Sequence, residues 1–125
     1  MKSTFIIKEN NIFRYILKKG RYAKGKFLVV HIYNKNIVKE QPDNTNFLGI
    51  CVSKKNGNSV ERNKFKRWVR EIYKNEEENI KKNLNIVILL KKTSNIENLD
   101  YNKIFEDIIK CFRELEMYEK IKKNV

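Results

Sequence analysis

The stretch that most limits how this chain can fold runs from residue 49 to residue 74, where an apolar segment leads through a polar turn into an amphipathic helix. Residues 47–53 predict a strand, and Lys-Lys-Asn-Gly-Asn at 54–58 predicts a turn. Ser59 is placed to cap a helix that continues to about residue 74. Apolar side chains recur along it at helical spacing, at Phe65, Trp68, Val69 and Ile72. One face of this helix must therefore be buried against a core.

The other faces of the helix, and the turn before it, are strongly cationic. Eight Lys and Arg residues and two Glu residues lie between positions 49 and 74, which gives this segment a net charge of +6. The whole chain of 125 residues has a formal net charge of +13 and a pI of about 9.8. An ordinary solvated helix face remains the alternative interpretation, but such faces usually mix charge signs. The charge favours a nucleic acid as the partner, with an anionic membrane surface second.

Phosphate binding is the chemistry that these residue types suit. Arg presents planar, forked donors that match phosphate, and Asn offers donors to a base edge, a ribose or a phosphate. We also expect the amino-terminal end of the helix to face the same region as the turn lysines. The candidate nucleic-acid-binding residues of the segment are Lys54, Lys55, Arg62, Asn63, Lys66, Arg67 and Arg70.

The rest of the chain predicts a single α/β (α+β) domain over residues 1–125. A helix is expected over residues 9–19, strands over 26–33 and 85–90 with a short extra strand at 21–24, and a loop over 39–46. We expect Leu28–Ile32 and Leu48–Val52 to pair as antiparallel neighbours. The run of glutamates at 76–78 is expected to be a solvated face or a helix end. Asp100 caps a last helix, and the expected order is α-β-β-β-α-β-α.

Several function classes find no support in the sequence. There is no apolar run of about 18 residues and no secretory signal pattern, so we expect the protein to stay in the cytoplasm without contact with a membrane. The only histidine, His31, lies in an apolar strand, and three aspartates fall in separate elements. The two cysteines, Cys51 and Cys111, suit buried reduced thiols. We therefore predict no catalytic residue and no metal site in the protein.

The segment Val-Ser-Lys-Lys-Asn-Gly-Asn-Ser-Val-Glu-Arg-Asn-Lys-Phe-Lys-Arg-Trp-Val-Arg-Glu resembles the signature of the bacterial ribonuclease P protein subunit. That family has Val-Ser-Lys-Lys, a glycine turn, Arg-Asn-Arg, then Lys-Arg and Arg-Glu. The resemblance extends over nearly the whole chain. Lys64 stands at the second arginine of the triplet, which keeps the charge and loses the forked geometry. The matching positions are Lys54, Lys55, Gly57, Val60, Arg62, Asn63, Lys66, Arg67, Arg70 and Glu71.

The resemblance implies a mixed four-stranded sheet with three helices and a left-handed β-α-β crossover, a hand that is rare among such connections. It implies that the protein binds the catalytic RNA of ribonuclease P, with Lys64 among the contacts, and assists 5′ maturation of precursor tRNA. Chemistry would belong to the RNA and its bound Mg²⁺, with no cofactor bound by the protein alone and no obligate protein partner. The alternative is another non-catalytic RNA-binding protein, such as a ribosomal protein; a free-standing nuclease is a third class.

The resemblance also implies a cleft for the 5′ leader of precursor tRNA, with Phe13, Leu17 and Val30 as its residues. Phe13 would face the central strands from the first helix, where an aromatic ring stacks on an unpaired base. Plain core packing is the alternative role for Phe13. Leu17 and Val30 stand where family members often have Phe and Tyr, so leader contacts are expected to be less aromatic here or to shift to Tyr33 or Tyr22.

Overall fold

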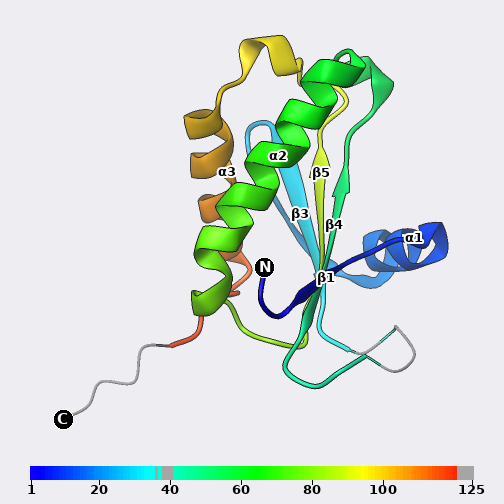
Figure 1. Cartoon of the computed structure of the whole chain (residues 1–125), viewed down its shortest axis with the longest axis vertical. Coiled ribbons are helices and arrows are strands. Elements are labelled where there is room, and N and C mark those ends of the chain that lie inside the picture. Colours follow the sequence, from blue (N-terminus) through cyan, green and yellow to red (C-terminus); the bar gives the residue numbers. More distant parts are fainter. Residues whose placement is uncertain (36, 38–40, 121–125) are drawn as a thin grey trace.

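The computed structural model describes residues 1–35, 37 and 41–120, and it forms one mixed sheet with three helices (Figure 1). The helices are α1 (Asn10–Lys19), α2 (Ser59–Glu76) and α3 (Tyr101–Glu114). The strands are β1 (Thr4–Ile6), β2 (Arg21–Lys24), β3 (Leu28–Tyr33), β4 (Asn46–Cys51) and β5 (Asn85–Leu90). The expected α+β class is confirmed, with five strands in place of four because residues 4–6 form an additional edge strand. Positions 39 and 40 of the predicted loop lie outside the described residues.

The order of the sheet is β1-β4-β5-β3-β2. β5 pairs parallel with β4 and antiparallel with β3, so the predicted antiparallel pairing of Leu28–Ile32 with Leu48–Val52 is wrong. The physical reason is the composition of β5, Asn-Ile-Val-Ile-Leu-Leu, in which five of six residues are buried. A strand that is apolar on both faces is most stable in the centre of a sheet, and there it separates β3 from β4.

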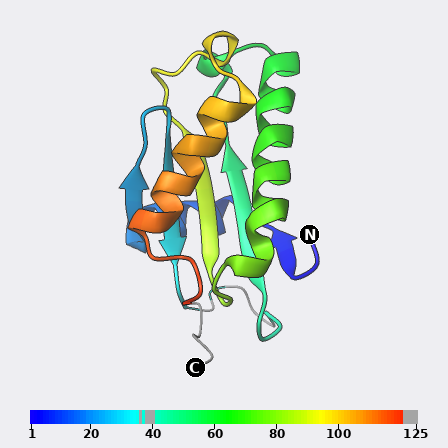
Figure 2. The ribbon, with the colours of Figure 1, turned by 90° about the vertical axis from the view of Figure 1, so that its left-hand side faces the viewer.

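The chain crosses from β4 to β5 through α2. Figure 2 shows the sheet with α2 and α3 toward the viewer: β4 runs upward, α2 descends in front, and β5 runs upward again to the left of β4. A right-handed crossover would place β5 on the right. The connection is left-handed, as the family resemblance implies.

The two faces of the sheet are covered unequally. α2 and α3 cover one face, and α1 alone lies on the other (Figure 1). The main core fills the space under α2 and α3 and includes Phe65, Ile88 and Phe112, all fully buried. The smaller core under α1 centres on Ile16 and Val87. Because α1 has only 10 residues, part of its face of the sheet stays open.

The glutamate run at 76–78 is only partly the solvated feature that we expected. Glu77 is 4% exposed, and its carboxylate accepts hydrogen bonds from the backbone N–H groups of Lys2 and Ser3 and from the hydroxyl of Thr4. Thr4 also shares a hydrogen bond with the hydroxyl of Tyr73 on α2. Glu77 therefore ties the edge strand β1 to the end of α2. The sequence pattern could not reveal this, because the donors lie more than 70 residues away.

We expect Glu77→Gln to destabilise the fold by about 1–3 kcal/mol at neutral pH, because an amide replaces one acceptor oxygen with a donor. Burial alone would raise the pKa of Glu77, but the hydrogen bonds from Thr4, Lys2 and Ser3 outweigh it and hold the pKa below the ordinary value of 4.5. A lowered pKa means that the unfolded chain binds more protons, so this contribution is present above pH 4.5 and is lost as the pH falls below it.

Denaturant unfolding between neutral and acidic pH measures this difference. The wild type should lose more stability than Glu77→Gln as the pH falls, so that the two curves converge. Glu78→Gln, which changes an exposed neighbour, should follow the wild type throughout. A constant offset between wild type and Glu77→Gln across the pH range would contradict the assignment.

Candidate nucleic-acid interface

Local capping and one buried stripe fix the orientation of α2. The cap is Asn58, one residue before the predicted Ser59: its side chain accepts from the backbone N–H of Glu61, and the Glu61 carboxylate accepts from the N–H of Asn58. Phe65, Val69 and Ile72 are fully buried against the sheet. The cap uses the backbone N–H of Glu61 and places the Glu61 carboxylate at this end of the helix. This N–H is therefore not free to bind a phosphate, and the carboxylate lies where we expected an anion.

Arg62, Lys66 and Arg70 follow one another at intervals of four residues, so they form one row along α2. Asn63 and Arg67 are exposed beside this row. We call these five residues the basic helix face. The Nε of Arg62 is buried without a hydrogen-bond partner among the described residues. The predicted concentration of donors on one side of the helix is therefore present in the structure.

Lys64 lies apart from the basic helix face. Its ammonium group is 5.1 Å from the centroid of the Trp68 ring, one turn further along α2. At 3.6 residues per turn, these two residues project from the flank opposite Lys66 and Arg70. Lys64 therefore makes a cation–π contact with Trp68 on a side of α2 different from that of Arg62.

Phe13 lies where the prediction placed it, on α1 and facing the central strands. Its ring packs against Gly49 of β4 so closely that a Cβ at Gly49 would be 2.2 Å from Cε1 of the ring. Phe13 also lines a small cavity of about 190 Å³ together with Lys66 and Arg70. The basic helix face and the candidate leader residue therefore meet at the edge of the sheet. Leu17 is partly buried in the same small core.

The prediction that Val30 lines the cleft is wrong. Val30 is fully buried in the main core, on the face of the sheet that α2 and α3 cover. Successive strand residues point to opposite faces, so a placement that is wrong by one residue exchanges the two faces. Its neighbours Val29 and His31 face the α1 side.

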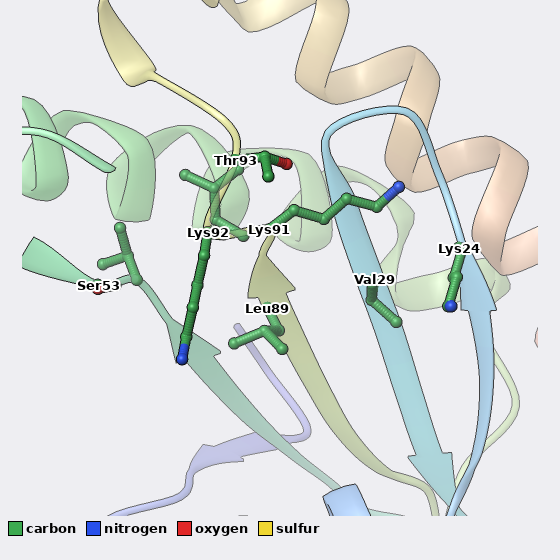
Figure 3. A pocket seen from close by; sticks show the side chains of 9 residues that line it. Lys24, Val29, Ser53, Leu89, Lys91, Lys92 and Thr93 are labelled. Atoms are coloured by element: carbon green, nitrogen blue, oxygen red, sulfur yellow. The ribbon is translucent and has the colours of Figure 1, made fainter. Parts of the chain in front are cut away.

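The uncovered part of the α1 side is a groove of about 560 Å³ at the ends of β4 and β5 (Figure 3). Its floor contains Val29 and Leu89, which are directly opposite each other in the sheet. Figure 3 shows three lysine side chains around this floor, Lys24 and Lys91 on one side and Lys92 on the other. The groove is lined by Lys24, Val29, Val52, Ser53, Leu89, Leu90, Lys91, Lys92 and Thr93.

We did not predict Lys24, Lys91 and Lys92 from the sequence. The signal was present in Lys-Lys directly after the buried strand β5, as Lys54 and Lys55 follow β4. Because β4 and β5 are parallel, both pairs emerge at the same edge of the sheet. Asn56 joins the two ends by donating to the carbonyls of Lys91 and Ser94 at 2.8 Å each. We call Lys54, Lys55, Lys91 and Lys92 the strand-end lysines.

Tyr22 is the most exposed aromatic ring beside the groove. It is 57% exposed on β2, its ring centroid lies 5.5 Å from that of His31, and the Lys24 ammonium lies 5.7 Å from the Tyr22 centroid. Burial lowers the pKa of His31, so this ring is neutral at neutral pH. Burial raises the pKa of Cys51 against the opposing effect of Lys66, so the thiol stays protonated. The Tyr22 and His31 rings offer stacking surfaces, and the Lys24 ammonium offers hydrogen-bond donors.

Within residues 1–35, 37 and 41–120, no three His, Cys, Asp or Glu side chains gather in a way that could hold a metal ion. None of the helices described is long and apolar enough to cross a membrane. The arrangement around the groove is that of a small α/β domain of the RNA-binding class.

Comparison with known proteins gives the family. The family model described as Ribonuclease P matches residues 1–116. The ribonuclease P protein component of Dictyoglomus turgidum is 34% identical over 115 residues, which is 91% of each chain, and that of Alkaliphilus metalliredigens is 32% identical over 94% of this chain and 98% of the relative. The RNase P protein of Staphylococcus aureus superposes with a TM-score of 0.77 at 29% identity, covering 91% of this chain and 97% of that one. The Thermotoga maritima protein gives 0.70 at 28%, covering 85% and 93%.

The chain belongs to the ribonuclease P protein family. Its function is that of the protein subunit of ribonuclease P.

Proposed function

We propose that the protein binds the catalytic RNA of ribonuclease P through the basic helix face and holds the 5′ leader of precursor tRNA on the open part of the sheet. One observation carries this proposal: Lys24, Lys91 and Lys92 surround an apolar groove on the open face of the sheet, and Lys66 and Arg70 of α2 line a separate small cavity with Phe13 at the edge of that sheet. Cations together with apolar and aromatic surface are the combination that binds single-stranded RNA. A cytoplasmic location is part of the proposal.

In this account the protein supplies charge, and the RNA carries out the cleavage. Each phosphate that a Lys or Arg neutralises releases condensed counterions and lowers the repulsion between the catalytic RNA and its substrate. We therefore expect the protein to reduce the concentration of Mg²⁺ that the reaction needs. Mg²⁺ belongs to the holoenzyme in this proposal and is held mainly by RNA.

The leader contact is assigned to Phe13 and Tyr22 at the two sides of the open sheet face. Lys66 and Arg70 line the same cavity as Phe13, and the Lys24 ammonium lies over the Tyr22 ring. A base that stacks on either ring would have a cation near its phosphate. Tyr22 offers the aromatic surface that Leu17 does not provide, and for this reason the leader site of this chain extends toward β2.

We expect Phe13→Ala to lower the affinity of the holoenzyme for precursor tRNA by about 1–3 kcal/mol, the value of one lost base–aromatic stack. Its affinity for mature tRNA, which has no leader, should not change. Equilibrium binding of both RNAs at one salt concentration measures this difference. Phe13→Leu serves as the control for core packing, because it fills the space against Gly49 without an aromatic face. Equal weakening for precursor and mature tRNA would refute the leader contact.

A further inference from the structure

Tyr15, on the flank of α1 that faces away from the groove, forms an aromatic pair with Tyr33 of β3. Ile16 is fully buried toward the sheet, and the helical repeat places Phe13 and Leu17 on one flank of it and Tyr15 on the other. The Tyr15 ring lies nearly parallel to that of Tyr33, with centroids 5.3 Å apart and planes at 9°. Their hydroxyl oxygens are 3.4 Å apart.

The register of the sheet separates this pair from the groove. On the α1 side, Val29 and Leu89 are paired at the groove end, and Tyr33 and Asn85 are paired at the opposite end. Val87 lies between them on β5 and is fully buried against α1. The Tyr15–Tyr33 pair and the groove are therefore two surfaces with α1 between them.

The pair keeps a free aromatic face. Tyr15 is 42% exposed although it stacks on Tyr33, because a stacked ring covers only one face of its neighbour. The hydrogen bond shared with Tyr15 raises the pKa of Tyr33.

Cations adjoin the pair on the side of Tyr33. A notch of about 260 Å³ is lined by Lys19, Arg21 and Lys35 together with Gly20, Ile32, Tyr33 and Asn34. Arg21 pairs with Ile32, which faces the main core, and it donates to the carbonyl of Leu115 at the end of α3 at 3.3 Å, so its guanidinium points to the other face of the sheet. Lys19 and Lys35 are the remaining cations of the lining, which contains no carboxylate. An aromatic surface beside these cations suits a base and its phosphate, whereas an apolar peptide would gain nothing from two lysine side chains.

We propose that Tyr15, Tyr33 and the adjoining notch bind a second stretch of single-stranded RNA, the part of the precursor leader that lies upstream of the nucleotides on the open sheet face. The inference rests on the proposed function, because the leader must first lie on that face. It adds a separate contact that only a longer leader reaches, because the RNA strand must pass over α1 to get there. Affinity should then increase with leader length beyond what the groove and Phe13 provide.

The test compares precursors with leaders of about four and about sixteen nucleotides, the span of typical single-stranded binding sites. With holoenzyme made from Tyr15→Ala, affinity for the long-leader precursor should fall by about 5- to 100-fold, the equivalent of one lost stack. Affinity for the short-leader precursor should stay within about twofold of wild type. Tyr15→Phe should keep wild-type affinity for both, because the ring remains. Tyr15→Leu keeps the apolar contact without an aromatic face, so it should show the same loss of affinity for the long leader only. It takes the place of Tyr15→Ala if that variant folds poorly.

Phe105→Ala is the matched control. Phe105 is 37% exposed and stacks on Tyr101 at 6.4 Å and 10°, but it lies on α3, across the sheet from α1. It should change neither affinity. The inference is overturned if wild type does not bind the long leader more tightly, or if Tyr15→Leu weakens both leaders equally. It is also overturned if Tyr15→Leu weakens neither. Loss of precursor binding by Phe13→Ala alongside an inert Tyr15 would leave the proposed function intact and remove only this second site.

Discussion

Asp107→Ala is expected to destabilise the fold by about 3–5 kcal/mol and to lower the melting temperature by roughly 10–20 °C. Asp107 is on α3 and is 5% exposed. Its carboxylate accepts three backbone hydrogen bonds from the turn between β2 and β3, from Lys26 at 2.6 Å, Phe27 at 2.9 Å and Leu28 at 3.0 Å. Alanine leaves all three N–H groups without this acceptor; the Leu28 bond is buried and the other two are partly buried, and an unsatisfied buried donor costs about 1–3 kcal/mol. A loss of this size is a large fraction of the total stability of an ordinary domain.

Gly25 makes this contact possible. A Cβ at Gly25 would lie 2.3 Å from the carboxylate of Asp107, so only glycine lets the turn approach α3 so closely. Thermal and denaturant unfolding measure the effect. Asp107→Asn retains one acceptor oxygen and should lose less than Asp107→Ala, and Glu106→Ala, an exposed neighbour on the same helix, should remain within about 0.5 kcal/mol of wild type. An Asp107→Ala protein that melts within a few degrees of wild type would contradict the assignment.

Removing Arg62, Lys66 and Arg70 together should lower affinity for ribonuclease P RNA by at least about 100-fold at physiological salt. These three residues form the row of the basic helix face nearest to the Phe13 cavity. A charge-assisted hydrogen bond contributes about 1.5–3 kcal/mol, and each lost phosphate contact reduces the slope of log K against log salt by about 0.7–0.9. The triple glutamine variant should therefore show a slope smaller by about two to three.

A matched triple variant separates position from net charge. Changing Lys103, Lys110 and Arg113 to glutamine removes the same charge from the neighbouring helix α3, where these side chains are exposed and lie away from the Phe13 cavity. Its salt slope should change by less than one. If both triple variants lost affinity and slope equally, binding would follow net charge alone, and the basic helix face would have no special role.

The features that the sequence predicted well are those that depend on neighbours along the chain. The apolar stripe of α2 and its cationic flank follow from a repeat of 3.6 residues, so Phe65, Val69 and Ile72 were correctly assigned to the core. Phe13 faces the central strands, as the family resemblance implied. Asp100 caps α3 as predicted, since its side chain accepts from the backbone N–H of Lys103 at 2.8 Å.

The features that the sequence predicted badly depend on partners far along the chain. Val29 and Val30 are both apolar, so the sequence pattern fits equally well with either of them facing α1. The register of the sheet decides between them. Glu77 and Asp107 look like surface carboxylates until the fold brings backbone donors to them from 74 or more residues away. Lys91 and Lys92 join the site only because β4 and β5 are parallel, which the order of elements does not establish.

Cleavage of precursor tRNA at low Mg²⁺ tests the central claim most directly. Bacterial ribonuclease P RNA should cleave slowly on its own under these conditions, and the folded protein should raise the rate substantially. The Arg62, Lys66 and Arg70 triple variant should give little of this increase, and the protein freed of RNA should cleave nothing. No stimulation by folded wild-type protein, or cleavage by the protein alone, would contradict the account.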